Sequence, residues 1–176
     1  ATTDNSSAVF TLHSGNWLSN AKSNTTFEIG NGGSTAISRS YKALRINNRI
    51  INDIDKAPLT PEQKNEILGQ AYFYRSWFYF QIIKRYGGMP IIDKVFEGGD
   101  DDIPRVTYHE SHDWMMEDIQ KAIYMLPDSW DDPNYGRPTK ITAMALKEWA
   151  QLFDASPLMQ NDLNSTENKG YDTERA

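Results

Sequence analysis

The chain has 176 residues, a formal net charge of -6 at pH 7 and no cysteine. This length gives room for one ordinary domain with a substantial core, or for one lobe of a larger protein. The acidic balance argues against general binding to nucleic-acid phosphates or to an anionic membrane surface, and the lack of cysteine excludes disulfides and thiolate metal ligands.

The first 33 residues are rich in Gly, Ser, Thr and Asn, which predicts a loop-rich N-terminal segment over 1–33. Trp17 lies in this segment together with Asn20 and Asn24. Carbohydrate sites stack a sugar face on an aromatic ring and bond the hydroxyls with amide side chains, so these three residues are candidate ligand contacts. The alternative, that Trp17 only anchors the loop to a core, stays open.

Apolar residues at helical spacing predict a first helix over 34–54. Its inward face comprises Ile37, Tyr41, Leu44, Asn48 and Ile51. Asn48 is the polar member of that face. Because buried polar groups need partners, we expect its amide to be bonded to neighbouring backbone.

A second helix is predicted over 60–86, since Thr60 and Gln63 form a capping box around a proline, and Gly87 follows the last turn. This helix is apolar on nearly every side, which indicates a central position. Arg75 lies within it and would be costly to bury without an acceptor. We therefore expect carbonyl oxygens or a carboxylate to bind its guanidinium, with a ligand-binding role as the alternative.

Two further helices are predicted downstream. A capping box at Thr107 and Glu110 begins one helix that runs to about Leu126. The other runs over about 139–155. Its predicted buried stripe comprises Leu146, Trp149, Ala150 and Phe153. Residues 160–176 are polar and have no helical or strand period, which is typical of a loop that has been cut off.

Four helices in two consecutive pairs, without a convincing strand, predict an all-α fold. Helix pairs in series favour an α-solenoid of tetratricopeptide type over 34–159, with long loops at 91–106 and 127–138. Two pairs are fewer than the three or so repeats that such stacks normally need. We therefore expect the helical region to be part of a larger fold.

Motifs for catalysis or metal binding are weak, and no cofactor is predicted. The carboxylates that could form a glycosidase pair are Asp100, Asp101, Asp102, Asp128, Asp131 and Asp132. All of them lie in loops, where a solvated acidic role is the expectation. His109 and His112 share one helical turn, but the spacing indicates no third metal ligand. The oxygen-rich segment 128–134 lacks the Gly and the terminal Glu of an EF-hand calcium loop.

A second aromatic cluster lies between the third and fourth predicted helices. Trp130 and Tyr135 occur there with Asn134 and Arg137, which is the same kind of composition as the cluster around Trp17. Anchoring of the loop to the core and contact with a ligand are both open for this cluster.

Longer motifs make the sequence similar to a known family. The run GQAYFYRSWFYF over residues 69–80, followed by RYGGMPI over 85–91, resembles the SusD/RagB family. Further segments that agree in order and spacing are NRII over 48–51, GRPTK over 136–140 and AMALK over 143–147. The resemblance covers about residues 35–160. Gln70 stands where the family usually has Glu, a carboxylate that could have paired with Arg75, so Arg75 needs another acceptor here.

The resemblance implies a cell-surface lipoprotein of the outer membrane in Bacteroidetes, which binds glycans or sometimes peptides and is not an enzyme. It implies a SusC-like TonB-dependent transporter as partner, and tetratricopeptide-like helices that form a scaffold and much of the transporter contact. The ligand site of the family is built largely by loops. Family chains are much longer and begin at a lipid-bearing Cys, so this sequence would be an N-terminal part that starts downstream of that anchor.

Two other classes of function stay open. A repeat scaffold would bind a peptide in its groove and would not bind sugars. A helical glycosidase would release product from an oligosaccharide and would lose that activity on a single Asp to Asn change.

Overall fold

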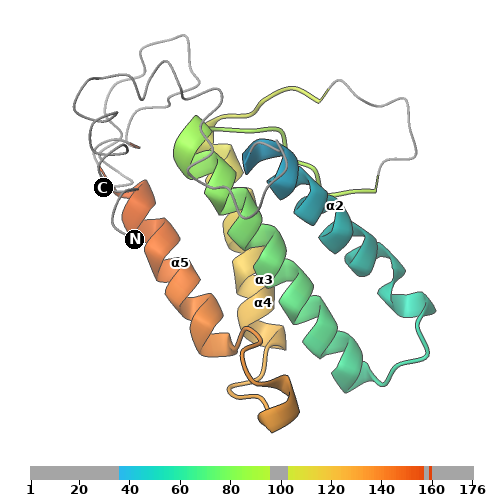
Figure 1. Ribbon diagram of the computed structural model, residues 1–176. Helices are drawn as coiled ribbons and strands as arrows, with labels where there is room; N and C mark the ends of the chain where they lie inside the picture. The colour runs from blue at the N-terminus through green and yellow to red at the C-terminus, as the bar shows by residue number, and fades with distance from the viewer. Residues whose placement is uncertain (1–35, 96–102, 157–158, 160–176) are drawn as a thin grey trace, which may run out of the picture. The chain divides into compact units, whose positions relative to one another are not determined.

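The computed structural model describes residues 36–95, 103–156 and 159, and the chain divides into two compact units, Ala1–Arg39 and Ser40–Ala176. The described residues are mainly helical and include no strand, which confirms the all-α prediction. Figure 1 shows the elements in chain order: α2 (Ala36–Asp53), η1 (Ile54–Lys56), α3 (Pro61–Tyr86), α4 (Tyr108–Met125), η2 (Asp132–Asn134) and α5 (Lys140–Asp154). No helix in these ranges has the length and hydropathy needed to cross a bilayer.

Each of the three helices after α2 begins at a threonine that caps it. The Thr60 hydroxyl accepts a hydrogen bond from the Gln63 amide, and the Gln63 side chain accepts one from the Thr60 amide. Thr107 and Glu110 form the same reciprocal pair at α4, and a third box begins α5 at Thr139. These bonds satisfy amide groups that the first turn of a helix leaves without an internal partner. The helix starts predicted from the capping residues are confirmed.

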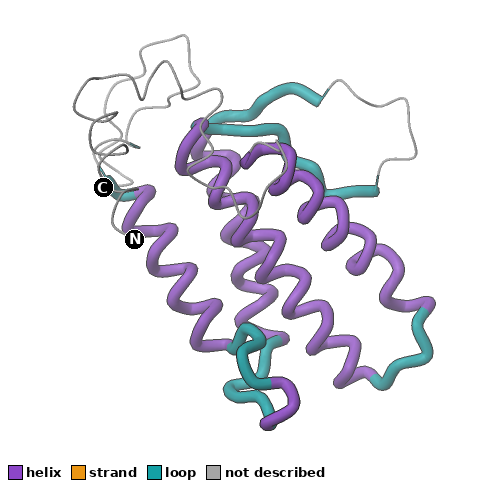
Figure 2. The backbone as a smooth tube through the Cα atoms, in the orientation of Figure 1, coloured by secondary structure: helices purple, strands orange, loops and turns teal. Residues whose placement is uncertain are grey.

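Helix α3 is the centre of the second unit, as the sequence predicted. Figure 2 shows α2 along one side of α3 and α5 along the other, and α4 packs against both α3 and α5. The large apolar side chains that α3 buries are Phe73, Tyr79, Phe80, Ile82 and Ile83, and those from α4 are Tyr108, Met115 and Ile119. Successive helices run antiparallel, so the chain forms two consecutive helix pairs around this core.

The crossing of α3 with the end of α4 is tight at Gly69. A Cβ atom placed on Gly69 would lie 3.0 Å from Cγ of Leu126 and 3.1 Å from Cβ of Met125. Such distances are shorter than ordinary van der Waals contact, so only a residue without a side chain allows the two helices to approach this closely.

The predicted burial of Trp149 is wrong in part. Leu146 and Ala150 of the predicted stripe are buried and Phe153 is half-buried, but Trp149 is 42% exposed. Trp149 lies at the edge of the stripe, where its ring meets the rings of Trp77 and Phe80 on α3. The spacing that placed it in the stripe is therefore correct, but a border position on an outer helix is covered from one side only.

We predict that Gly69→Ala lowers the free energy of unfolding by about 1–3 kcal/mol, because the added methyl group overpacks the contact with Leu126. An exposed position would instead gain from the better helix propensity of Ala. Urea denaturation measures the change. Asn65→Ala, at an exposed position of the same helix, is the matched control and should be neutral or slightly stabilising. Equal stabilisation by both variants would contradict the tight crossing.

Candidate functional site

The predicted ligand contacts Trp17, Asn20 and Asn24 lie outside the described residues, so their role stays a prediction. The acidic run 100–102 also lies outside them. What the structure describes is the helical frame from which the connecting segments leave, together with the second aromatic cluster.

A buried polar network occupies the middle of this frame. The Arg75 guanidinium donates to both carboxylate oxygens of Asp118, at 2.5 and 2.8 Å, and its remaining terminal nitrogen donates to the Asn48 side-chain oxygen at 2.8 Å. All three side chains are buried, with Arg75 only 4% exposed. The expectation of a carboxylate acceptor is confirmed, and the alternative that Arg75 binds a ligand does not fit this enclosed position.

Asp118, the carboxylate acceptor of Arg75, was not identified from the sequence. Its position carried a signal, because it follows Met115 by three residues and precedes Ala122 by four, which places it on the buried side of α4. A charged residue at such a position needs a partner of opposite charge. The pairing itself joins residues 43 positions apart, which helical spacing does not reveal.

Asn48 extends the network to the segment that follows α3. Its side-chain nitrogen donates to the backbone carbonyls of Ile92 at 2.8 Å and Lys94 at 3.1 Å. The prediction that Asn48 is buried and bonded to backbone is confirmed. Because Asn48 lies on α2 and Arg75 on α3, the network ties two helices to the start of the 91–106 connection.

The turn after α3 is held by a second set of bonds. The Tyr79 hydroxyl donates to the Met89 carbonyl at 2.9 Å, and the Met89 amide donates to the Ser111 hydroxyl at 3.1 Å. Arg105 donates to the Gly88 carbonyl at 2.9 Å. Gly87 has φ of 73°, a left-handed value that favours glycine. Burial raises the pKa of the Tyr79 phenol far above its ordinary value, so it stays a donor at any physiological pH.

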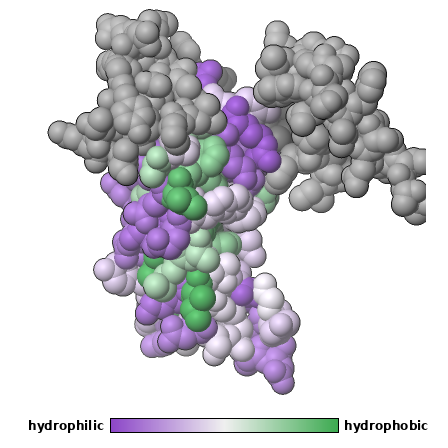
Figure 3. Space-filling view, turned by 90° about the vertical axis from the view of Figure 1, so that its left-hand side faces the viewer, coloured by the Kyte–Doolittle hydropathy of each residue, from purple (hydrophilic) through white to green (hydrophobic). Residues whose placement is uncertain are grey.

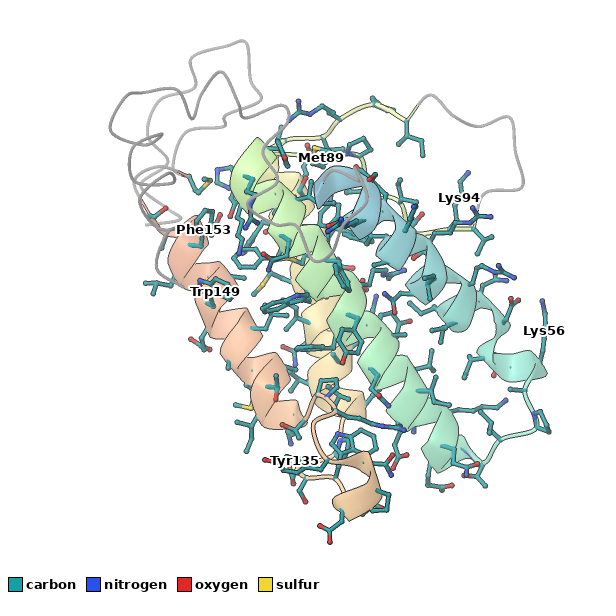
Figure 4. The ribbon with its side chains drawn as sticks, viewed as in Figure 1. Lys56, Met89, Lys94, Tyr135, Trp149 and Phe153 are labelled. Atoms are coloured by element: carbon teal, nitrogen blue, oxygen red, sulfur yellow. The ribbon has the colours of Figure 1, made fainter. Side chains whose placement is uncertain are left out.

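The structure separates the second aromatic cluster into an anchor and an exposed ring. Trp130 is half-buried, and its indole nitrogen donates to the Pro138 carbonyl at 2.8 Å. This bond supports the alternative that Trp130 anchors the loop. The Arg137 guanidinium lies 5.5 Å from the Trp130 ring. Tyr135, in contrast, is 90% exposed, and it lies at the end of the bundle opposite Met89 (Figure 4). Of this cluster, Tyr135 is the ring available to a ligand.

An open groove of about 670 Å³ runs along α4 next to α5. Its lining residues are Asp113, Met116, Glu117, Gln120, Lys121, Tyr124 and Lys147. The Lys147 ammonium donates to the Gln120 side chain at 3.0 Å, and the Tyr124 ring is largely exposed beside them. This groove could not be predicted from helical spacing, because it depends on the packing of α5 against α4.

Lys84 lies over two aromatic rings between α3 and α5. Its ammonium is 4.4 Å from the centre of the Trp149 ring and 5.2 Å from that of Phe80. Burial, with a smaller contribution from the neighbouring Arg85 charge, lowers the pKa of Lys84 to about 8. At neutral pH the side chain is still mainly charged and can make a cation–π contact with the exposed edge of the aromatic core.

Among the described residues, no group of three His, Asp or Glu side chains converges on a point where a metal ion could bind. His109 lies 3.4 Å from Asp154, and His112 lies 3.5 Å from Asp113, so the two histidines face different carboxylates. The loop carboxylate of Asp131 accepts a hydrogen bond from Asn134 at 2.6 Å.

The chain is similar to SusD-like proteins along most of its length. A family model of SusD-like proteins, described as starch-binding and associating with the outer membrane, matches residues 1–148. SusD-like protein P38 of Formosa agariphila is 28% identical over 102 residues, which are 57% of this chain and 20% of that protein. SusD-like protein P2 of the same organism is 27% identical over 111 residues, which are 61% and 21%. The chain thus spans about a fifth of these relatives.

Solved structures agree in fold. A SusD-like protein from Bacteroides fragilis superposes with a TM-score of 0.66 at 36% identity, over 68% of this chain and 24% of that one. A laminarin-binding SusD-like protein has a TM-score of 0.64 at 20% identity, over 68% of this chain and 26% of that one. The predicted tetratricopeptide-like helical fold, as part of a larger SusD-like fold, is confirmed by these neighbours.

We predict that Tyr79→Phe lowers the free energy of unfolding by about 1–3 kcal/mol, because the Met89 carbonyl loses its principal buried donor. Chemical denaturation measures the loss. Tyr74→Phe is the matched control, since it makes the same change on the same helix at a partly exposed position, and should stay within about 0.5 kcal/mol of the parent. Equal effects of the two variants would show that the hydroxyl does not hold the turn.

Proposed function

The chain belongs to the SusD-like family, and on that premise we propose that it is a glycan-binding protein of the outer-membrane surface, which delivers oligosaccharide to a SusC-like TonB-dependent transporter. The observation that carries the proposal is the family match over residues 1–148, with its description as starch-binding and associating with the outer membrane. The protein binds its ligand without cleaving it, and a lipid anchor upstream of this sequence holds it at the cell surface.

Two solved structures that are similar to this chain are named as carbohydrate-binding proteins, which supports the proposed ligand class. One is a laminarin-binding SusD-like protein, and the other is a SusD-like carbohydrate-binding protein from Bacteroides fragilis, with a TM-score of 0.59 at 21% identity over 73% of this chain and 26% of that one. They share the fold of this chain. An oligosaccharide is therefore the ligand class that we propose.

In this proposal the parts of the chain have different tasks. The helical region 34–159 is the scaffold, and its buried bonds fix the points from which the connecting segments leave. The N-terminal segment 1–33 supplies ligand contacts, with Trp17 stacking on a sugar face and Asn20 and Asn24 bonding its hydroxyls.

Native affinity electrophoresis of the complete protein, through gels that contain starch, laminarin or other single polysaccharides, tests the function. Retardation by one glycan without release of reducing ends is the expected result. Release of reducing ends would replace the binding function by a glycosidase. Migration that no glycan retards, together with binding to peptides in a peptide-rich extract, would overturn the glycan class in favour of peptides.

We predict that Trp17→Ala weakens the affinity for the retarding glycan by about 1–3 kcal/mol, the usual loss when a stacking residue is removed. Isothermal titration calorimetry of the complete protein measures it. Tyr135→Ala is the comparison variant, because Tyr135 is the most exposed ring of the second aromatic cluster. An affinity within twofold of the parent for Trp17→Ala would remove Trp17 from the site, and a loss confined to Tyr135→Ala would move the site to the loop before α5.

A further inference from the structure

The groove along α4 next to α5 combines an exposed aromatic ring with hydrogen-bonding side chains. Tyr124 is 81% exposed, and the half-buried Met116 lines the same groove. The other lining residues carry carboxylate, amide or ammonium groups. Figure 3, which views the molecule from the side where α5 lies, shows hydrophobic patches among hydrophilic residues on that side. The volume of about 670 Å³ is within the range of about 300–1,000 Å³ that is usual for ligand sites.

Helical spacing brings the α4 residues of the groove into one row. Asp113, Glu117, Gln120 and Tyr124 follow one another at spacings of four, three and four residues, so they share one face of α4. From Asp113 to Tyr124 this row extends about 16 Å at the rise of an α-helix. A long and open row of this kind suits an extended ligand chain that lies along the helix.

Two of the ammonium groups in the groove are held in place. The Lys147 ammonium on α5 donates to the Gln120 side-chain oxygen on α4 at 3.0 Å. This bond uses one of the three donors of Lys147, and the Gln120 amide nitrogen is a further donor. The Lys121 ammonium lies 3.4 Å from the Asp118 carboxylate and 5.2 Å from the centre of the Tyr72 ring. Donors that are already positioned lose less conformational entropy when a ligand binds.

The charges that line the groove balance each other. Asp113 and Glu117 contribute two carboxylates, and Lys121 and Lys147 contribute two ammonium groups. An anionic polysaccharide would be attracted by an excess of cations, which this groove lacks. A peptide would need a strand edge or a continuous apolar groove, and two helices with Met116 as the aliphatic lining residue offer neither. Hydroxyl groups both donate and accept, so an uncharged sugar can bond to all four charged side chains.

We propose that this groove is a binding site for a neutral oligosaccharide, with Tyr124 stacking on a sugar face and Gln120 and Lys147 donating to its hydroxyl groups. The carboxylates of Asp113 and Glu117 accept hydrogen bonds from other hydroxyl groups. The inference rests on the proposed glycan-binding function. It adds to that function an uncharged class of sugar and a site formed by two helices instead of loops.

Acetylation of lysines in the complete protein, followed by peptide mass spectrometry, reports on the groove itself. The probes are linear oligosaccharides from starch and laminarin, which are uncharged, and from alginate, which is a polymer of uronate. Isothermal titration calorimetry gives the affinity for each probe. Lys147 is the reporter inside the groove, and Lys56, whose side chain is 76% exposed, is the reference outside it.

The expected result is that a starch or laminarin oligosaccharide, at about ten times its Kd, slows acetylation of Lys147 about tenfold, because about a tenth of the protein stays unliganded. Acetylation of Lys56 should not change. In Tyr124→Ala the protection of Lys147 at the same concentration should fall below about threefold, because the stacking ring is lost. Tyr124→Phe keeps the ring and should keep the protection. Tyr74→Ala, which removes a partly exposed ring on α3, is the matched control and should also keep it.

The possible failures are distinguishable. Binding of a neutral oligosaccharide in calorimetry without protection of Lys147, or protection that survives in Tyr124→Ala, would overturn the groove site and leave the glycan-binding function in place. Protection by the alginate oligosaccharide alone would overturn the neutral class of ligand. Binding of neither neutral oligosaccharide would also overturn the inference. In that case, retardation of the protein by another polysaccharide would keep the glycan-binding function, and no retardation would remove it as well.

Discussion

The buried guanidinium of Arg75 is the constraint on which the rest of the helical frame depends. An ionised group away from water is destabilising by several kcal/mol unless it is paired and fully hydrogen-bonded. Its acceptors are the carboxylate of Asp118 on α4 and the amide oxygen of Asn48 on α2. Because these acceptors lie on different helices, the bonds of one side chain fix the relative register of three helices. Apolar packing alone tolerates many registers, but this hydrogen-bond geometry allows few.

The same network explains how a helical scaffold can position loops. Asn48 uses its amide nitrogen to hold the carbonyls of Ile92 and Lys94, so the first part of the connection after α3 is tied to α2. Tyr79 and Ser111 bond to the backbone of Met89, three residues before Ile92. A binding protein needs loops that leave a rigid frame at fixed points, since a preorganised site loses less entropy when the ligand binds. In the proposed function, the frame fixes the points from which the loops leave.

Much of the frame could be predicted from the sequence, because the signals are local. Capping residues predict where the helices begin. A polar residue inside an apolar stripe, such as Asn48 or Arg75, predicts a buried hydrogen bond. What helical spacing cannot give is the partner. Asp118 is far from Arg75 in the chain, and the groove on α4 also includes Lys147 of α5, which meets Gln120 across the two helices. The partial exposure of Trp149 could not be predicted for the same reason, since it depends on neighbours from α3. The helix pattern predicted the all-α fold class, the family motifs predicted the larger SusD-like fold, and the ligand contacts of the N-terminal segment are still predictions.

A double-mutant cycle on Arg75 and Asp118 tests the dependence of the frame on this pair most directly. Arg75→Met leaves the buried Asp118 carboxylate with only the Lys121 ammonium at 3.4 Å, and Asp118→Leu leaves the buried Arg75 without a carboxylate, so each should lower the free energy of unfolding by about 3–5 kcal/mol in urea denaturation. The double variant leaves no stranded charge, so its loss should be smaller than that of either single variant. Losses that simply add, or single variants that each lose less than about 1 kcal/mol, would contradict the account.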